Sequence, residues 1–189
     1  MFRAQVPLMQ IVSHEWERVY AEIVKSKNES AQQREYLRWT HADGLMSWDD
    51  EKGLWLKGDF LEDEELRLHS QSTPLQLLEW YVGGESSKYN SNGYLKPSIL
   101  HLEDFHPYLE EEPTPHSDRI YIIWWLRQAA RMHIKQGAEE RTIILGNTSP
   151  CFPQELENEL PTIVLGPPGL KNLRAVFNAV VRDFKLKGE

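Results

Sequence analysis

The chain has 189 residues, the usual length of a single domain, and 40% of them are hydrophobic, including seven tryptophans. This composition excludes a disordered chain and predicts a packed core. A net charge of −8, from 21 basic and 29 acidic residues, disfavours contact with nucleic-acid phosphates. The single cysteine, Cys151, excludes a disulfide within the chain and a CxxC zinc site, and it is typical of a reducing compartment.

No segment of the sequence has the features of a signal peptide or a membrane span. Residues 1–10 contain Arg3 and Pro7 but no apolar core. The most apolar stretch, residues 120–126, is far shorter than the roughly 20 residues that cross a bilayer. We therefore expect a cytoplasmic protein that makes no membrane contact.

The first predicted unit is a strand at residues 7–12 followed by a helix. Ser13 is expected to cap this helix, with acidic residues in the first turn. Apolar side chains recur along it at offsets of three and four residues, which predicts one buried face. These side chains are Trp16, Val19, Tyr20, Ile23 and Val24.

The next elements are less regular. Residues 35–40 alternate in hydrophobicity as a second strand does. Two short apolar runs, at residues 54–56 and 60–61, flank Gly58 and Asp59 and predict a small exposed hairpin. We expect this hairpin to belong to an inserted hairpin and loop region.

A short helix is expected to begin after Thr73 and to end at Gly83. Pro74 at its first position and Gln76 at its third are typical of a helix N-terminus. From residue 98 onward, strands and helices alternate with clear boundaries. The expected strands are residues 98–102, 142–145 and 162–165, and the expected helices are residues 118–136 and 170–186.

Strands joined by helices of this length require right-handed parallel crossovers. The predicted fold is therefore α/β, a three-layer α/β/α sandwich with a mostly parallel sheet of about five strands. We expect one domain over residues 1–189, with the insertion at about residues 46–96.

Two segments resemble phosphate-binding loops in part. Residues 166–172 follow a strand, but their spacing is one residue short of GxxxxGK[ST] and Asn172 replaces the hydroxyl. We interpret them as a strand-to-helix turn. Residues 13–17 follow the first strand without glycine or lysine, and Glu15 and Glu17 stand where phosphates would lie. Tight nucleotide binding of the ordinary kind is therefore not expected.

Polar residues occur where the predicted strands end. Two adjacent carboxylates follow the third strand, as in the magnesium-binding strand of P-loop NTPases, although solvated strand-end carboxylates look the same. Asn147 ends the next strand, at the position that senses the terminal phosphate in AAA+ ATPases, or it forms a turn before proline. The candidate polar cluster consists of Ser13, His14, Glu103, Asp104, His106 and Asn147.

The segment from His101 to His106 can also be interpreted as a metal site. In a strand, however, its four candidate ligands divide between two faces, so the site would need His14 or His41 as well. We therefore predict neither a metal ion nor catalytic residues in this chain.

Several stretches resemble the N-terminal, degenerate (Walker-less) domain of AAA+ ATPases from bacteria, cyanobacteria and algal plastids. The similarity spans about residues 6–184. Its segments are IVSHE at residues 11–15, LEDFHPYL at 102–109, WLRQAAR at 125–131 and TIIL at 142–145. The resemblance implies a P-loop NTPase topology without its phosphate loop, located in the cytoplasm or the plastid stroma. It also implies that ATP and Mg²⁺ would bind only to a separate ATPase module.

By this resemblance the domain is non-catalytic and acts through protein contacts, as an adaptor or as the regulatory N-terminal part of an AAA+ ATPase. The expected partner is a protein or the ATPase module. Whether the chain also forms a homo-oligomer stays open. The candidate partner surface consists of Trp48, Trp55, Glu62, Asp63, Glu64 and Glu65.

Two alternatives remain from the residues alone. One is a metal-dependent hydrolase or nuclease that uses Glu103, Asp104 and His106. The other is a nucleotide-binding regulator that holds its ligand near Ser13, with Asp104 and Asn147, without hydrolysing it.

Overall fold

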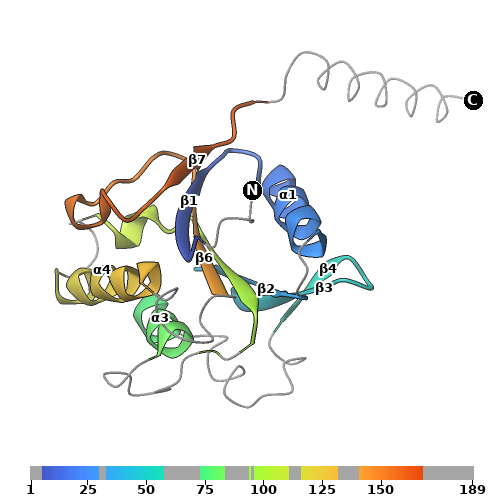
Figure 1. The fold of residues 1–189 in the computed structure, drawn as a ribbon, viewed down its shortest axis with the longest axis horizontal. Helices are drawn as coiled ribbons and strands as arrows, with labels where there is room; N and C mark the ends of the chain where they lie inside the picture. Colours follow the sequence, from blue (N-terminus) through green and yellow to red (C-terminus); the bar gives the residue numbers. More distant parts are fainter. Residues whose placement is uncertain are drawn as a thin grey trace, which may run out of the picture.

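The computed structural model describes residues 6–29, 33–57, 73–83, 94, 96–110, 116–131 and 141–167. Within these residues, a seven-stranded sheet has the order β4-β3-β2-β5-β6-β1-β7 (Figure 1). Five of the strands are parallel to one another, which confirms the predicted mostly parallel α/β fold. They are β1 (Leu8–Val12), β2 (Glu35–Thr40), β5 (Ser98–Glu103), β6 (Arg141–Asn147) and β7 (Thr162–Val164).

Helices cover both faces of the sheet, as expected for a three-layer sandwich. Helix α1 (Trp16–Asn28) lies on one face, and α3 (Pro74–Val82) and α4 (His116–Ala130) lie together on the other (Figure 1). Two short 3-10 helices, η2 (His106–Tyr108) and η4 (Gln154–Leu156), follow β5 and β6. Each face therefore has its own apolar cluster.

The buried face of α1 is the one that the apolar spacing predicts. Val19, Tyr20 and Ile23 are buried, and Trp16 and Val24 pack against the same cluster. The prediction that Ser13 caps this helix was wrong.

The N-cap of α1 is Glu15, and Ser13 Oγ accepts a hydrogen bond from the Glu15 backbone N–H at 3.0 Å. The Ser13 N–H donates to the Asn147 carbonyl at 3.0 Å. Because this bond continues the ladder between β1 and β6, Ser13 extends the strand and lies too early in the chain to cap α1.

Helix α3 begins with the predicted capping box. Thr73 Oγ1 accepts from the Gln76 N–H, Gln76 Oε1 accepts from the Thr73 N–H, and Pro74 occupies the first helical position. The helix ends at Gly83, whose φ of 67° suits glycine.

The position of the hairpin corrects the prediction. Strand β3 (Gly44–Asp49) pairs antiparallel with both β2 and β4 (Leu54–Lys57). The hairpin therefore turns at residues 50–53, where Asp49 Oδ1 accepts two backbone N–H bonds and Gly53 has a φ of 63°. Residues 58–61, the expected turn and second strand, lie outside the described residues. Part of the expected insertion thus extends the sheet by two strands.

On α4, Trp125 is 4% exposed and Trp124 is 39% exposed, so one indole packs inward and the other faces outward. The strand expected at residues 162–165 is β7, a half-buried edge strand, because it pairs with β1 on one side alone. The expected helix at residues 170–186 lies outside the described residues. No described helix is long and apolar enough to span a membrane.

Candidate functional site

The candidate polar cluster lies along one edge of the sheet. Strands β5, β6 and β1 are parallel neighbours, so their carboxyl ends meet at this edge. The chain leaves β1 toward β2 and leaves β6 toward β7, in opposite directions along the sheet. Open α/β sheets bind ligands at such a point, outside the carboxyl ends of the strands.

The structure brings two of the predicted residues into contact. Ser13 and Asn147 are buried and joined by the backbone hydrogen bond from Ser13 to Asn147. The Asn147 side chain is held by Gln10 of β1, because its Nδ2 donates to Gln10 Oε1 at 3.3 Å. His14, the third residue of this group, is exposed.

The remaining predicted residues diverge after β5. Glu103 is half-buried, whereas Asp104 is exposed and has a φ of 51°, the one non-glycine residue in the described ranges with a positive φ. His106 opens η2 and is half-buried. The described residues contain no group of three or more His, Cys, Asp or Glu side chains that could hold a metal ion.

An indole fills the space at the start of α1. Trp16 is the first residue of this helix, and its ring centroid lies 5.8 Å from that of His101 on β5. Both rings lie against Gly146 of β6, where an added Cβ would be 2.3 Å from His101 Nε2 and 3.1 Å from Trp16 Cζ3. Glycine at this position is therefore required by the two rings that lie over it.

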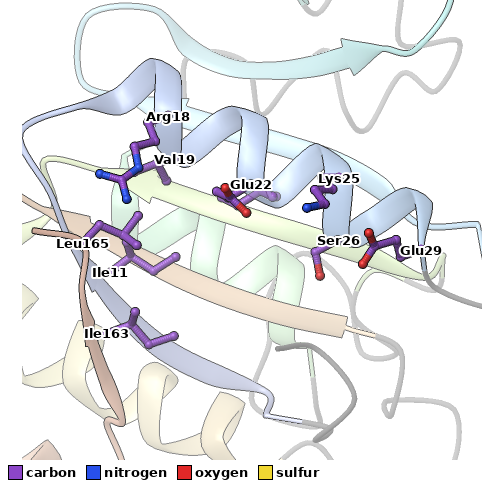
Figure 2. Close-up of a pocket in the computed structure, with 10 residues that line it drawn as sticks. Ile11, Arg18, Val19, Glu22, Lys25, Ser26, Glu29, Ile163 and Leu165 are labelled. Atoms are coloured by element: carbon purple, nitrogen blue, oxygen red, sulfur yellow. The ribbon is translucent and has the colours of Figure 1, made fainter. Parts of the chain in front are cut away.

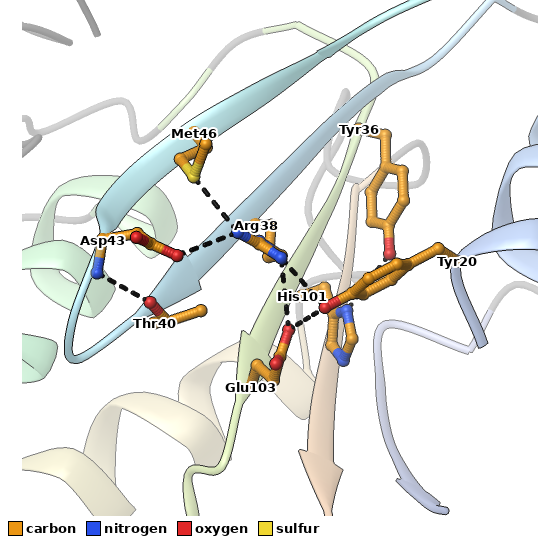
Figure 3. A network of polar contacts seen from close by, with 8 residues as sticks. All are labelled: Tyr20, Tyr36, Arg38, Thr40, Asp43, Met46, His101 and Glu103. Carbon is orange, nitrogen blue, oxygen red and sulfur yellow. Dashed lines mark hydrogen bonds and ion pairs between the residues drawn. The ribbon is translucent and has the colours of Figure 1, made fainter. Parts of the chain in front are cut away.

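Beside these rings, Arg38 is the centre of a polar network (Figure 3). Its Nη1 donates to Tyr20 Oη at 2.9 Å and lies 3.7 Å from Glu103 Oε2. Its Nη2 donates to Asp43 Oδ2 at 3.0 Å. The Tyr20 hydroxyl donates to the Glu103 carboxylate. The network connects α1, β2, β5 and the turn that follows β2.

The network changes the acidity of its members. Burial raises the pKa of the Glu103 carboxyl above its usual value, against the opposing effects of Tyr20 and Arg38. Burial, followed by the hydrogen bond to Glu103, raises the pKa of the Tyr20 phenol. Tyr20 therefore stays protonated and serves as a donor, while Glu103 serves as an acceptor.

His101 is completely buried in the middle of the sheet. Burial lowers its pKa to about 3, with a smaller contribution from Arg38, so the imidazole is neutral. Its Nδ1 lies 3.1 Å from Tyr36 Oη, and its Nε2 has no hydrogen-bond partner in the described part of the chain. The ring therefore acts as a packing element with one satisfied polar atom.

The hairpin covers this network with tryptophan. The Trp55 ring lies 4.8 Å from the Arg38 guanidinium carbon and 4.8 Å from the Tyr36 ring centroid. Trp48 contacts Trp55 across the hairpin, and both are half-buried against the apolar cluster under α1. The expectation of an exposed hairpin was therefore wrong for these two residues, because Trp55 packs onto Tyr20 and Tyr36 and Trp48 packs onto Trp55. Residues 62–65, the acidic part of the predicted surface, lie outside the described residues.

Sequence reasoning missed Arg38 and the polar role of Tyr20. Tyr20 fits the apolar face of α1, and nothing local marks its hydroxyl. Arg38 carried a usable signal: in a strand it shares a face with the aromatic Tyr36, and a charge on a buried face requires a partner. The partner strand could not be known in advance, because Arg38 lies beside His101 only through the pairing of β2 with β5.

Comparison with known proteins identifies the family of the chain. The family model of the SpoVK-like AAA ATPase N-terminal domain matches residues 1–165. No curated protein and no solved structure matches the chain significantly. The family match covers most of the sequence and confirms the resemblance to N-terminal domains of AAA+ ATPases. The chain therefore belongs to the family of SpoVK-like AAA ATPase N-terminal domains.

Proposed function

We propose that this domain is non-catalytic, a pseudo-ATPase that acts through protein contacts as the regulatory N-terminal part of an AAA+ ATPase. The start of α1 carries the proposal. In phosphate-binding loops, free amides at a helix N-terminus cradle the anion. Here Glu15 is the N-cap residue and the Trp16 indole lies over Gly146. A carboxylate and an indole at this place disfavour a polyphosphate by charge and by volume.

The strand-end carboxylate supports the same conclusion. Glu103 accepts a hydrogen bond from Tyr20 and pairs with Arg38 at 3.7 Å. A magnesium ion at Glu103 would lie beside the fixed positive charge of Arg38, which would repel it. Glu103 thus cross-links α1, β2 and β5 and is poorly suited to hold a metal.

An exposed apolar group on α4 offers a surface for protein contact. Ile120, Tyr121 and Trp124 are 48%, 57% and 39% exposed and lie on one side of the helix, at offsets of one and four residues. Neighbouring exposed apolar side chains are typical of interaction sites. In a family of N-terminal ATPase domains, the ATPase module is the partner that we expect at this surface.

Calorimetric titration with ATP, ADP and a non-hydrolysable analogue, with and without Mg²⁺, tests the first part. We expect no binding at micromolar concentrations. Micromolar binding would contradict the proposal and favour the nucleotide-binding regulator. A rise in the melting temperature with Mg²⁺, Mn²⁺ or Zn²⁺ that Glu103→Gln removes would instead favour the metal-dependent hydrolase.

A binding assay with the ATPase module of a SpoVK-like AAA ATPase tests the second part. We expect the chain to bind the module and to change its rate of ATP hydrolysis. Tyr121→Asp should weaken binding at least tenfold, because it places a charge in the exposed apolar group. Glu17→Ala, an exposed change on α1 across the sheet, is the matched control. Equal affinity for the two variants would refute the α4 surface.

A further inference from the structure

A groove of about 190 Å³ lies between α1 and the edge of the sheet formed by β1 and β7 (Figure 2). Ile11, Ile163 and Leu165 line it from the strand side, and Val19 and Ile23 line it from the helix. The charged and polar residues of α1 that border it are Arg18, Glu22, Lys25, Ser26 and Glu29. The groove is thus apolar at its base and polar along one rim.

The groove exists because the two faces of the sheet are unequally covered. On the opposite face α3 and α4 pack side by side, whereas α1 is the one described helix on this face (Figure 1). Strand β7 lies at the sheet edge and pairs with β1 on one side alone. Ile163 and Leu165 consequently stay half-buried beside buried Ile11.

The chain leaves the described region at the mouth of this groove. The Leu165 N–H donates to the Val12 carbonyl at 2.9 Å. Arg18 Nη1, from the first turns of α1, donates to the Gly166 carbonyl at 2.8 Å. Gly166, next to the last described residue, therefore lies beside the N-terminal part of α1.

The sequence that follows has the pattern of an amphipathic helix. Apolar residues recur with a helical period, and the basic residues Lys171, Arg174, Arg182 and Lys185 lie away from that stripe. The apolar residues are Leu173, Phe177, Val180, Val181 and Phe184. A helix with this face needs an apolar partner, because exposing five large side chains in one stripe is unfavourable.

We propose that residues 170–186 dock as a helix in this groove, alongside α1. A helix that follows β7 starts at the carboxyl edge of the sheet and returns antiparallel to the strand, as α1 does after β1. The lining residues of α1 run from Arg18 to Glu29 and the apolar stripe from Leu173 to Phe184. Each spans about 16 Å at 1.5 Å per residue. Docking would give both faces of the sheet two helices and would cover Ile163 and Leu165.

Hydrogen exchange on the full chain, followed by mass spectrometry, tests the docking. We expect amides of residues 173–184 to exchange at least tenfold more slowly than unstructured peptides. Ile163→Arg should abolish this protection, while Val164→Arg, at a side chain 65% exposed on the same strand, should preserve it. On the segment itself, Phe177→Asp should abolish protection and Arg182→Asp, on the opposite side of the helical wheel, should not.

Three results would overturn the proposal. The first is exchange of residues 173–184 at the intrinsic rate in the unmodified chain. The second is protection that survives Ile163→Arg while β5 and β6 keep their own protection, which would place the segment elsewhere. The third is protection that disappears on dilution together with a dimer in sedimentation, which would mean that the groove binds the segment of a second copy.

Discussion

Replacing Gly146 by alanine tests the packing at the carboxyl edge of the sheet. The added Cβ would lie 2.3 Å from His101 Nε2, about 1 Å closer than the 3.4 Å at which ordinary contacts begin, and 3.1 Å from Trp16 Cζ3. His101 cannot move away easily, because it is completely buried and bonded to Tyr36 at 3.1 Å. The methyl group must therefore displace a ring that is confined on several sides.

The cost follows from these contacts. Overpacking costs about 1–3 kcal/mol. Breaking the contact between His101 and Tyr36 leaves a buried polar group unsatisfied and adds about 1–3 kcal/mol. The reduced freedom of the unfolded chain returns about 0.5–1 kcal/mol. We expect Gly146→Ala to lower the free energy of unfolding by about 2–4 kcal/mol, a large part of the stability of a small domain.

Urea unfolding followed by tryptophan fluorescence measures the effect. Gly166→Ala is the matched control, because an added Cβ there meets no atom within 4 Å, and its free energy of unfolding should not fall and should rise by at most about 1 kcal/mol. In a double-mutant cycle, His101→Ala should recover at least about 1 kcal/mol of the loss caused by Gly146→Ala. A neutral Gly146→Ala, or strict additivity in the cycle, would refute the steric argument.

Three other variants test the parts of the site separately. Trp55→Ala should lower the free energy of unfolding by about 2–3 kcal/mol, because the indole packs on Arg38 and Tyr36. Leu54→Ala, on the exposed side of the same strand, should be nearly neutral. Equal effects of the two variants in urea unfolding would place the indole outside the core. Because the folded-state pKa of His101 is about 3 against 6.5 when unfolded, the unfolded state binds the extra proton between these values. Stability should therefore fall by up to about 1.4 kcal/mol per unit as pH drops through this window, and a His101→Gln variant that keeps the same slope would contradict the assignment. Gln10→Leu should lower the free energy of unfolding by about 2–4 kcal/mol, since Gln10 Oε1 accepts from the Cys151 N–H at 2.9 Å and its Nε2 donates to the Cys151 carbonyl at 2.8 Å. An unchanged rate of amide exchange at Cys151 in this variant would argue against the role of these two hydrogen bonds.

Local signals in the sequence were sufficient for much of the fold. The spacing of apolar residues predicted the buried face of α1, and Thr73 with Gln76 predicted the start of α3. The alternation of strands and helices predicted parallel pairing, because a helix between two strands returns the chain to the edge of the sheet where the first strand began. These features depend on residues close together in the chain, which is why the pattern alone determines them.

The hairpin shows where local signals fail. Two turn signals compete, at residues 50–53 and at residues 58–59, and both suit a reversal of the chain. The structure turns at residues 50–53, which pairs β4 with β3 and places Trp48 and Trp55 over the cluster under α1, while residues 58–59 lie outside the described residues. Burial of the two indoles against another element stabilises this pairing, and the turn residues alone do not encode it.

The site depends on tertiary structure almost entirely. Tyr20, Arg38 and Glu103 come from a helix and two strands, and their contacts join residues 18 and 83 positions apart in the chain. Gly146 reads as an ordinary glycine at a strand end until His101 and Trp16 are placed against it. The sequence by itself determined which residues are polar, apolar or small and which elements they form. Sheet order determined which of them meet, because side-chain contacts across parallel strands depend on pairing between distant segments.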